Sequence, residues 1–325
     1  MTPPVTVGVV ERWRDRLPVT EATPVVSLGE GGTPLLPAPR LSAELGCELL
    51  LKWEGANPTG SFKDRGMTVA VAKAVEEGAE AVICASTGNT SASAAAYAAR
   101  AGLRAVVLLP QGGVALGKLA QARAAGARLL EVRGSFDDAL DAARELARRG
   151  TYVLVNSLNP HRLQGQKTAA FEVVEELGGP PDLLTLPFGG GGNTRAYALG
   201  FDELGVAPRI VSVQAVDRAA TLASAIRIVA PAHRQEAEAA AEVVSVSDEE
   251  ILRAWRDLAE LEGLFCEPSS AAGVAGLRAR RPEPGARVVC VITGHGLKDP
   301  ATVDRTAPPP VAVEADLDAI EEAAA

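Results

Sequence analysis

The sequence has little lysine, little cysteine and no unbroken apolar segment of membrane-spanning length. Its 325 residues carry a net charge of −9, which argues against nucleic acid or an anionic membrane as a partner. The long apolar region at residues 92–110 is interrupted by Arg100 and Arg104, so it predicts a helix, a turn and a strand and no membrane span. The charged stretch at residues 11–16 lacks the apolar core of a signal peptide.

The four cysteines have none of the spacings that are typical of a metal site. Three of them lie in apolar segments, which predicts buried free thiols in a reducing compartment. We therefore expect a cytoplasmic protein without a bound metal ion. The cysteines are Cys47, Cys84, Cys266 and Cys290.

Lysine is scarce enough for each one to need an explanation, since the chain has only six and arginine supplies the remaining basic charge. One of them, Lys63, follows the turn residues of the segment 57–65 (NPTGSFKDR) at the start of a predicted helix. The positive end of a helix dipole favours the neutral amine, which can attack a carbonyl group. Ser61 and Asp64 have the spacing of a capping pair for this helix. An ordinary surface lysine after a turn is the alternative interpretation.

A run of four glycines follows an apolar segment at residues 183–188 that has the pattern of a buried strand. Amides without side chains can wrap a phosphate, and the dipole of the helix predicted to follow adds to the attraction. A side chain at Gly191 would then stand where the phosphate approaches. A flexible turn is the alternative, and a dinucleotide fingerprint fits poorly because its third glycine would fall on Thr194. The candidate phosphate-binding residues are Gly189, Gly190, Gly191, Gly192 and Asn193.

A lysine at a helix start and a distant phosphate-binding loop together predict pyridoxal phosphate, whose aldehyde needs an amine and whose phosphate needs a cradle. Five motifs, in the same order along the chain, resemble those of threonine synthases, a family of fold-type II pyridoxal-phosphate enzymes. The resemblance covers residues 12–306, and five ordered motifs are more specific than any one alone. The motifs are NPTGSFKDRGM at 57–67, ASTGNT at 85–90, NSLNPHRLQGQK at 156–167, FCEPSSAA at 265–272 and ITGHGLKD at 292–299.

Short apolar strands alternate with amphipathic helices, which predicts an α/β fold with mostly parallel sheets. Capping boxes predict helix starts after Ser135, with Asp138, and after Ser247, with Glu250. The acidic tail after Pro310 predicts a frayed helix. The predicted strands are residues 49–53, 81–85, 105–109, 128–132, 152–155, 183–187, 210–213 and 288–292.

The resemblance implies the two-domain, tryptophan synthase β-like fold of fold-type II enzymes, with the cofactor in the cleft between the domains. By that resemblance the smaller domain spans residues 45–150, and the larger one combines residues 1–44 with 151–325. We also expect a homodimer.

The resemblance also implies how the cofactor is held. Lys63 would bind pyridoxal phosphate covalently and, once the substrate displaces it, move protons between the substrate's Cα, Cβ and Cγ. Asn89 would donate a hydrogen bond to the 3′ oxygen of the ring, and the hydroxyl of Thr293 would face the pyridine nitrogen. A hydroxyl cannot hold that nitrogen protonated as a carboxylate would, so more of the carbanion chemistry would depend on the lysine.

The substrate implied by the resemblance is the small phosphorylated amino acid O-phosphohomoserine, converted with water to threonine and phosphate by γ-elimination and β-addition. The loop at 86–90 is suited to bind its carboxylate through amides at a helix start, although a plain helix cap would have the same pattern. The segment 156–167 supplies a planar cation, a point charge and neutral donors for its phosphate, or alternatively a solvated basic stretch. The candidate substrate-binding residues are Ser86, Thr87, Gly88, Thr90, Asn156, Ser157, Arg162, Lys118 and Lys167.

Two features depart from the family pattern. The glycine run at 189–192 resembles the version found in serine and threonine dehydratases, and the region 215–243 is shorter than in threonine synthases. A threonine synthase is favoured by the motifs at 57–67 and 292–299. A threonine or serine dehydratase and an enzyme for another phosphorylated amino acid, such as a cysteate synthase, are the alternatives. A silent binding protein is a further alternative, against which the presence of Lys63 argues, because binding alone needs no covalent bond.

Overall fold

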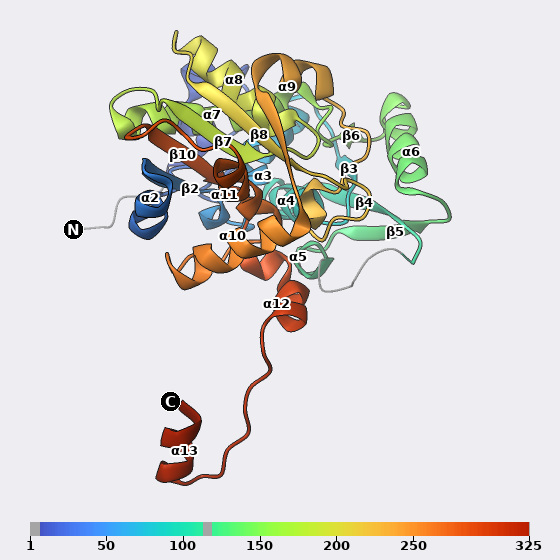
Figure 1. The fold of residues 1–325 in the computed structure, drawn as a ribbon. Helices are drawn as coiled ribbons and strands as arrows, with labels where there is room; N and C mark the ends of the chain where they lie inside the picture. Colours follow the sequence, from blue (N-terminus) through green and yellow to red (C-terminus); the bar gives the residue numbers. More distant parts are fainter. Residues whose placement is uncertain (1–6, 113–118, 325) are drawn as a thin grey trace, which may run out of the picture.

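The computed structural model describes residues 7–112 and 119–324, and its strands form two separate sheets (Figure 1). Among the described strands only β1 and β2 pair antiparallel, so the prediction of an α/β fold with mostly parallel sheets is confirmed. The six-stranded sheet has the spatial order β1 (Leu35–Pro37), β2 (Glu48–Trp53), β10 (Arg287–Ile292), β7 (Leu183–Pro187), β8 (Arg209–Ala215) and β9 (Glu242–Val246). The four-stranded sheet has the order β5 (Arg128–Val132), β4 (Arg104–Pro110), β3 (Ala81–Ala85) and β6 (Val153–Leu154).

All eight predicted strands are present, and β3, β5 and β7 have the predicted bounds. The strands β1 and β9 were not predicted, because β1 has only three residues beside prolines and β9 follows an alanine-rich helix without a turn signal. β2 lies within the range 45–150 yet pairs in the six-stranded sheet, whereas β6 lies beyond that range and completes the four-stranded sheet. The division into two domains at these residues stays a prediction.

Helices cover both faces of the four-stranded sheet because the side chains of its strands alternate between two faces. On β3, Val82 and Cys84 pack against one group of helices, while Ile83 and Ala85 pack against another. The first face is covered by α3 (Lys63–Glu76), α4 (Asn89–Ala101) and α5 (Ala120–Ala124), and the second by α6 (Phe136–Arg148).

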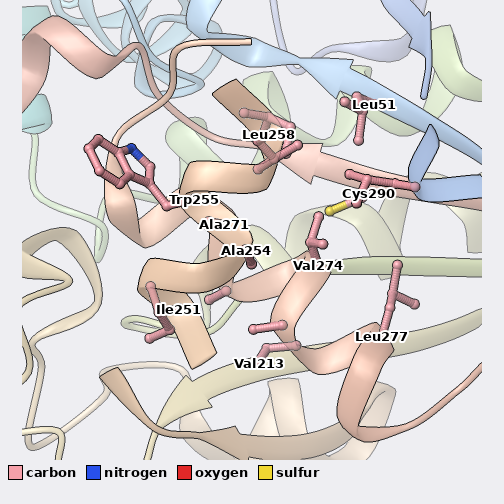
Figure 2. Packing of buried hydrophobic residues seen from close by; sticks show 14 of the residues in the cluster. Leu51, Val213, Ile251, Ala254, Trp255, Leu258, Ala271, Val274, Leu277 and Cys290 are labelled. Atoms are coloured by element: carbon pink, nitrogen blue, oxygen red, sulfur yellow. The ribbon is translucent and has the colours of Figure 1, made fainter. Parts of the chain in front are cut away.

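The six-stranded sheet is likewise covered on both faces. One face packs against α7 (Pro160–Leu177) and α8 (Gly192–Glu203), and the other against α2 (Pro39–Leu45), α10 (Asp248–Glu260) and α11 (Pro268–Ala279). Figure 2 shows Trp255 and Leu258 of α10 near Ala271 and Val274 of α11, above Cys290 of the sheet. All four cysteines are buried and free, as predicted.

Four shorter helices lie at the edges: α1 (Val9–Arg12), α9 (Arg234–Ala240), α12 (Pro300–Thr306) and α13 (Leu317–Ala324). α13 stands at the end of an extended segment, away from both sheets (Figure 1). Within the described part of the chain, no helix is both long and apolar enough to cross a membrane.

The capping signals were partly right. Ser135 with Asp138 and Ser247 with Glu250 both form reciprocal capping boxes, as predicted. The pair Ser61 and Asp64 does not, since Phe62 occupies the cap position of α3 and no side chain caps it.

Ser61 fails as a cap because it bridges Gly294 of another strand end, and its Oγ is buried without a hydrogen-bond partner among the described residues. The carboxylate of Asp64 turns elsewhere. It accepts from the amide and hydroxyl of Thr59, at 2.7 and 2.6 Å, and from the hydroxyl of Ser93 at 2.6 Å.

The two sheets meet through α3 and α7, which cross at a pair of glycines. A Cβ on Gly66 would lie 2.5 Å from the carbonyl oxygen of Arg162, and one on Gly165 would lie 2.0 Å from the carbonyl oxygen of Arg65. Only glycine permits so close an approach of two backbones. The crossing brings the amino-terminal end of α3, which begins at Lys63, next to the first turns of α7.

Gly165→Ala should therefore force the two helices apart and destabilise the protein by about 1–3 kcal/mol, the usual cost of overpacking. Gly179→Ala is the matched control, because a Cβ at Gly179 would meet no atom within 4 Å. Urea denaturation of both variants measures the effect. Equal stability of the two variants would show that the crossing is not tight.

Candidate active site

The candidate residues gather where parallel strands end. In open α/β sheets, ligands bind outside the carboxyl ends of the strands, where the following loops turn toward one crevice. The candidates follow five strands: residues 57–63 follow β2, 86–90 follow β3, 156–157 follow β6, 189–193 follow β7, and Thr293 follows β10.

Lys63 is the first residue of α3, as the sequence predicted, and its side chain is partly buried with Nζ 4.2 Å from the centre of the Phe62 ring. Burial lowers its pKa from 10.5 to about 7, and the nearby guanidinium of Arg162 lowers it further, while the carboxylate of Glu267 opposes the shift. A substantial fraction of this amine is therefore neutral at physiological pH. It is suited to attack an aldehyde.

The glycine loop presents its amides to the cleft. Arg218 Nη2 donates to the carbonyl oxygen of Gly189 at 2.6 Å, and the amide of His233 donates to that of Gly190 at 3.0 Å. In a trans peptide the N–H points opposite to the C=O, so the amides of Gly190 and Gly191 point away from both donors. No hydrogen bond between described residues uses these two amides.

The end of the loop is equally free to bind an anion. α8 begins at Gly192, and its first amides lack partners within the helix. The Nδ2 of Asn193 is buried without a hydrogen-bond partner in the described ranges. Free amides, a helix start and an unpaired donor fit the phosphate of pyridoxal phosphate.

The structure corrects the expectation for Gly191. A Cβ there would lie 2.6 Å from the carbonyl oxygen of His233, and its φ is +83°. A side chain at Gly191 therefore meets the protein itself, so this glycine is needed for the fold of the loop. At Gly190 the nearest atom to a Cβ is Ile228 Cδ1, at 3.7 Å, which leaves open space in front of the loop.

The two residues expected beside the cofactor ring meet at a buried carboxylate. Asn89 Nδ2 lies 3.1 Å from each carboxylate oxygen of Glu267, and Thr293 Oγ1 lies 3.5 Å from its Oε1. Ser270 Oγ hydrogen-bonds Thr293 Oγ1 at 2.9 Å. Asn89 and Thr293 thus lie together, as the resemblance implies, across 204 positions of sequence between residues 89 and 293.

Glu267 is a site residue that the sequence analysis missed. It is buried, it precedes α11, and burial raises the pKa of its carboxyl group. Lys63 and Lys298 both contribute positive potential at this carboxylate. The available signal was a charged residue within the otherwise apolar and small motif at 265–272, which was used only for the resemblance.

The loop at 86–90 lies at the start of α4, and part of it caps that helix. Ser86 Oγ accepts from the amides of Gly88 and Ser91, at 3.3 and 3.2 Å. Thr87 and Thr90 are partly exposed beside it, and a Cβ on Gly88 would meet no atom within 4 Å. The loop therefore borders open space, with amides at a helix start that suit a carboxylate.

Arg162 is the strongest candidate for an anion other than the cofactor. Its side chain is fully buried, yet only Nη1 has a partner, the carbonyl oxygen of Val155 at 3.2 Å. Nε and Nη2 are buried without a partner in the described part of the chain, and burial lowers the pKa of the guanidinium to about 10. A buried cation with free donors is costly, and an anionic ligand would offset this cost.

Three other substrate candidates are engaged elsewhere or lie outside the described residues. The amide of Asn156 hydrogen-bonds both backbone groups of Ala85, at 3.0 and 2.8 Å, and so extends the pairing of β6 with β3. Lys167 Nζ pairs with Glu203 Oε1 at 2.6 Å, toward α8. Lys118 lies outside the described residues.

Ser157 contributes its carbonyl oxygen to a contact with the ring of His233, 2.9 Å from Nε2. Among the residues that the structure describes, no group of three or more histidines, cysteines and carboxylates could hold a metal ion.

The model of the family described as pyridoxal-phosphate-dependent enzymes matches residues 26–294, so the chain belongs to this family. The prediction of pyridoxal phosphate as cofactor is thereby confirmed. The chain is similar to the threonine synthase of Halalkalibacterium halodurans, at 51% identity over 92% of each chain. It is 48% identical to that of Mycobacterium bovis, over 97% of this chain and 95% of the relative, and 44% identical to that of Methanocaldococcus jannaschii, over 96% and 86%.

Solved structures confirm the fold-type II architecture. A pyridoxal-phosphate-dependent aspartate racemase superposes with a TM-score of 0.79 at 21% identity, covering 93% of this chain and 99% of that one. Maize serine racemase superposes at 0.75 with 20% identity, covering 84% and 91%. A bacterial-type threonine deaminase, that of T.th., superposes at 0.72 with 26% identity, covering 81% and 92%.

In the apo-protein, Lys63 should react with an amine-directed acylating reagent with a pH midpoint near 7, because its ammonium loses a proton there and not near 10.5. Arg162→Gln removes a like charge and should raise this midpoint, whereas Glu267→Gln removes an opposite charge and should lower it. Mass spectrometry of the labelled peptide at several pH values measures the midpoint. Shifts of both variants in one direction would contradict the electrostatic account.

Gly190→Ala should leave the stability of the apo-protein nearly unchanged and weaken the binding of pyridoxal phosphate, since its methyl group enters the space in front of the loop. Gly191→Ala should instead destabilise the apo-protein, because its Cβ meets the carbonyl oxygen of His233. Thermal denaturation of the apo-proteins and fluorescence titration with the cofactor separate these effects. Unchanged cofactor affinity in Gly190→Ala would place the phosphate elsewhere.

Proposed function

We propose that the chain is a threonine synthase, a carbon–oxygen lyase that converts O-phosphohomoserine and water to threonine and phosphate. The observation that carries this proposal is the buried, unpartnered guanidinium of Arg162 close enough to lower the pKa of Lys63. The glycine loop accounts for the cofactor's phosphate, so Arg162 is left for a second anion. The similarity to threonine synthases over most of the chain supports the same conclusion.

The residues around the cleft divide the reaction between them. Pyridoxal phosphate, when bound, supplies an electron sink for negative charge that develops on the substrate. Lys63, with a pKa of about 7, can both accept and release protons at neutral pH, as transfers at Cα, Cβ and Cγ require. Asn89, held by Glu267, and Thr293 orient the ring. The amides at 86–90 bind the substrate's carboxylate.

Arg162 assists the departure of the leaving group. The bond between Cγ and the phosphate oxygen breaks, and phosphate leaves with the electron pair. The free Nε and Nη2 of Arg162 form a planar pair of donors that matches two phosphate oxygens and stabilises this charge. Water then adds its hydroxyl to Cβ, and Cγ gains the proton that completes the methyl group of threonine.

A threonine or serine dehydratase remains the second candidate, because the glycine run and the likeness to a threonine deaminase favour it. Such an enzyme releases ammonia from a substrate without phosphate. It would have no ligand for the two free donors of Arg162, and this residue is what separates the two candidates.

We also propose a cytoplasmic homodimer with domains at 45–150 and at 1–44 plus 151–325. Four buried free thiols support a reducing compartment. Analytical ultracentrifugation tests the dimer, and the domain boundaries can be tested by limited proteolysis.

Arg162→Lys keeps the charge but loses the planar pair of donors, so it should lower kcat/KM for O-phosphohomoserine at least about tenfold, or roughly 1.5–3 kcal/mol. Lys167→Gln is the control, because this cation of the same helix pairs with Glu203 and should leave KM unchanged. Steady-state release of phosphate measures both. Loss of activity in the control with none in Arg162→Lys would move the substrate's phosphate to the other face of α7.

A further inference from the structure

His233 touches both regions to which the proposed function gives a phosphate. It precedes α9, and only 6% of its surface is exposed. Its amide donates to the carbonyl oxygen of Gly190 at 3.0 Å, and its ring Nε2 lies 2.9 Å from the carbonyl oxygen of Ser157. Gly190 belongs to the cofactor loop, whereas Ser157 lies in the segment that leads into Arg162.

The neighbours of the ring select one tautomer. A carbonyl oxygen can only accept, so Nε2 carries the hydrogen toward Ser157. A guanidinium can only donate, and Arg195 Nη1 lies 3.4 Å from Nδ1, which therefore presents its lone pair. Both contacts are satisfied by the same neutral imidazole. Glu236 Oε1 is 3.9 Å from Nδ1 and also pairs with Arg195 at 3.4 Å, so it keeps this guanidinium beside the ring.

The glycine loop packs directly against the same histidine. A Cβ on Gly191 would lie 2.6 Å from the carbonyl oxygen of His233, and one on Gly192 would lie 3.4 Å from its Cδ2. A shift of the loop must therefore move His233, because no space separates them. Movement of the ring is then transmitted to Ser157 through the Nε2 hydrogen bond.

We propose that His233 is a positioning residue that couples the two phosphate-binding regions, so that an anion beside Arg162 and the cofactor phosphate on the glycine loop strengthen each other's binding. The inference rests on the proposed function, which assigns the second anion to Arg162. By linkage, the coupling acts equally in both directions. The enzyme would thus hold its cofactor most firmly while phosphate or a phosphorylated substrate is bound.

The test is the rate at which the holoenzyme releases pyridoxal phosphate, with and without saturating inorganic phosphate. An excess of an unrelated apo-enzyme that needs the cofactor traps what is released. A release rate is used because phosphate that merely competes for the empty glycine loop does not change it. In the wild type, phosphate should slow release about fivefold or more, the usual lower range of coupling between sites.

His233→Ala removes the ring but keeps the backbone hydrogen bond to Gly190, so release without phosphate should stay within about twofold of the wild type while the phosphate effect disappears. His233→Gln, whose amide nitrogen can donate to Ser157, should restore part of the effect, and it provides a second variant if the first does not fold. Glu236→Gln, which touches neither loop, is the control and should keep the effect.

The outcomes separate this inference from the proposed function. If phosphate inhibits turnover competitively but does not slow cofactor release, or still slows it in His233→Ala, the coupling is wrong and the proposed function stands. If phosphate does not bind the wild-type holoenzyme at all, the assignment of Arg162 to a second anion fails, and the coupling fails with it.

Discussion

The site depends on the close crossing of α3 and α7 at Gly66 and Gly165. Because each glycine faces the backbone of the other helix, the first turns of both helices are held side by side, which places Lys63 near Arg162. Buried ion pairs next to the crossing fix its geometry. They join Arg65 of α3 to Glu54 and to Glu172 of α7, and Lys52 to Glu172, at 2.6–3.1 Å. Buried ion pairs of this kind are expensive to break from one side, so the helices have little freedom to slide.

The same arrangement explains the chemistry. Two cations placed together out of water keep one of them, Lys63, largely neutral at physiological pH, while the guanidinium of Arg162 keeps its charge because its ordinary pKa is so high. The nucleophile and the anion site therefore arise from one electrostatic conflict. Glu267 moderates the conflict from the opposite side, where it also holds Asn89.

Sequence alone predicted the elements whose signals are local. Apolar segments gave the strands, paired side chains gave two capping boxes, and the loops after these strands contained most of the site. It failed where a side chain had two local choices and a distant contact decided between them: Ser61 bridges Gly294, and Asn156 pairs with Ala85. Glu267 was missed because its partner Asn89 lies 178 positions away. Such contacts leave no periodic pattern.

The central claim is that the cleft binds a substrate that carries its own phosphate. It is tested most directly by incubating the holoenzyme with O-phosphohomoserine and, separately, with threonine, while phosphate, threonine and ammonia are each assayed. The account predicts one threonine per phosphate from O-phosphohomoserine and negligible ammonia from threonine. Rapid release of ammonia from threonine, with neither phosphate nor threonine formed from O-phosphohomoserine, would contradict it.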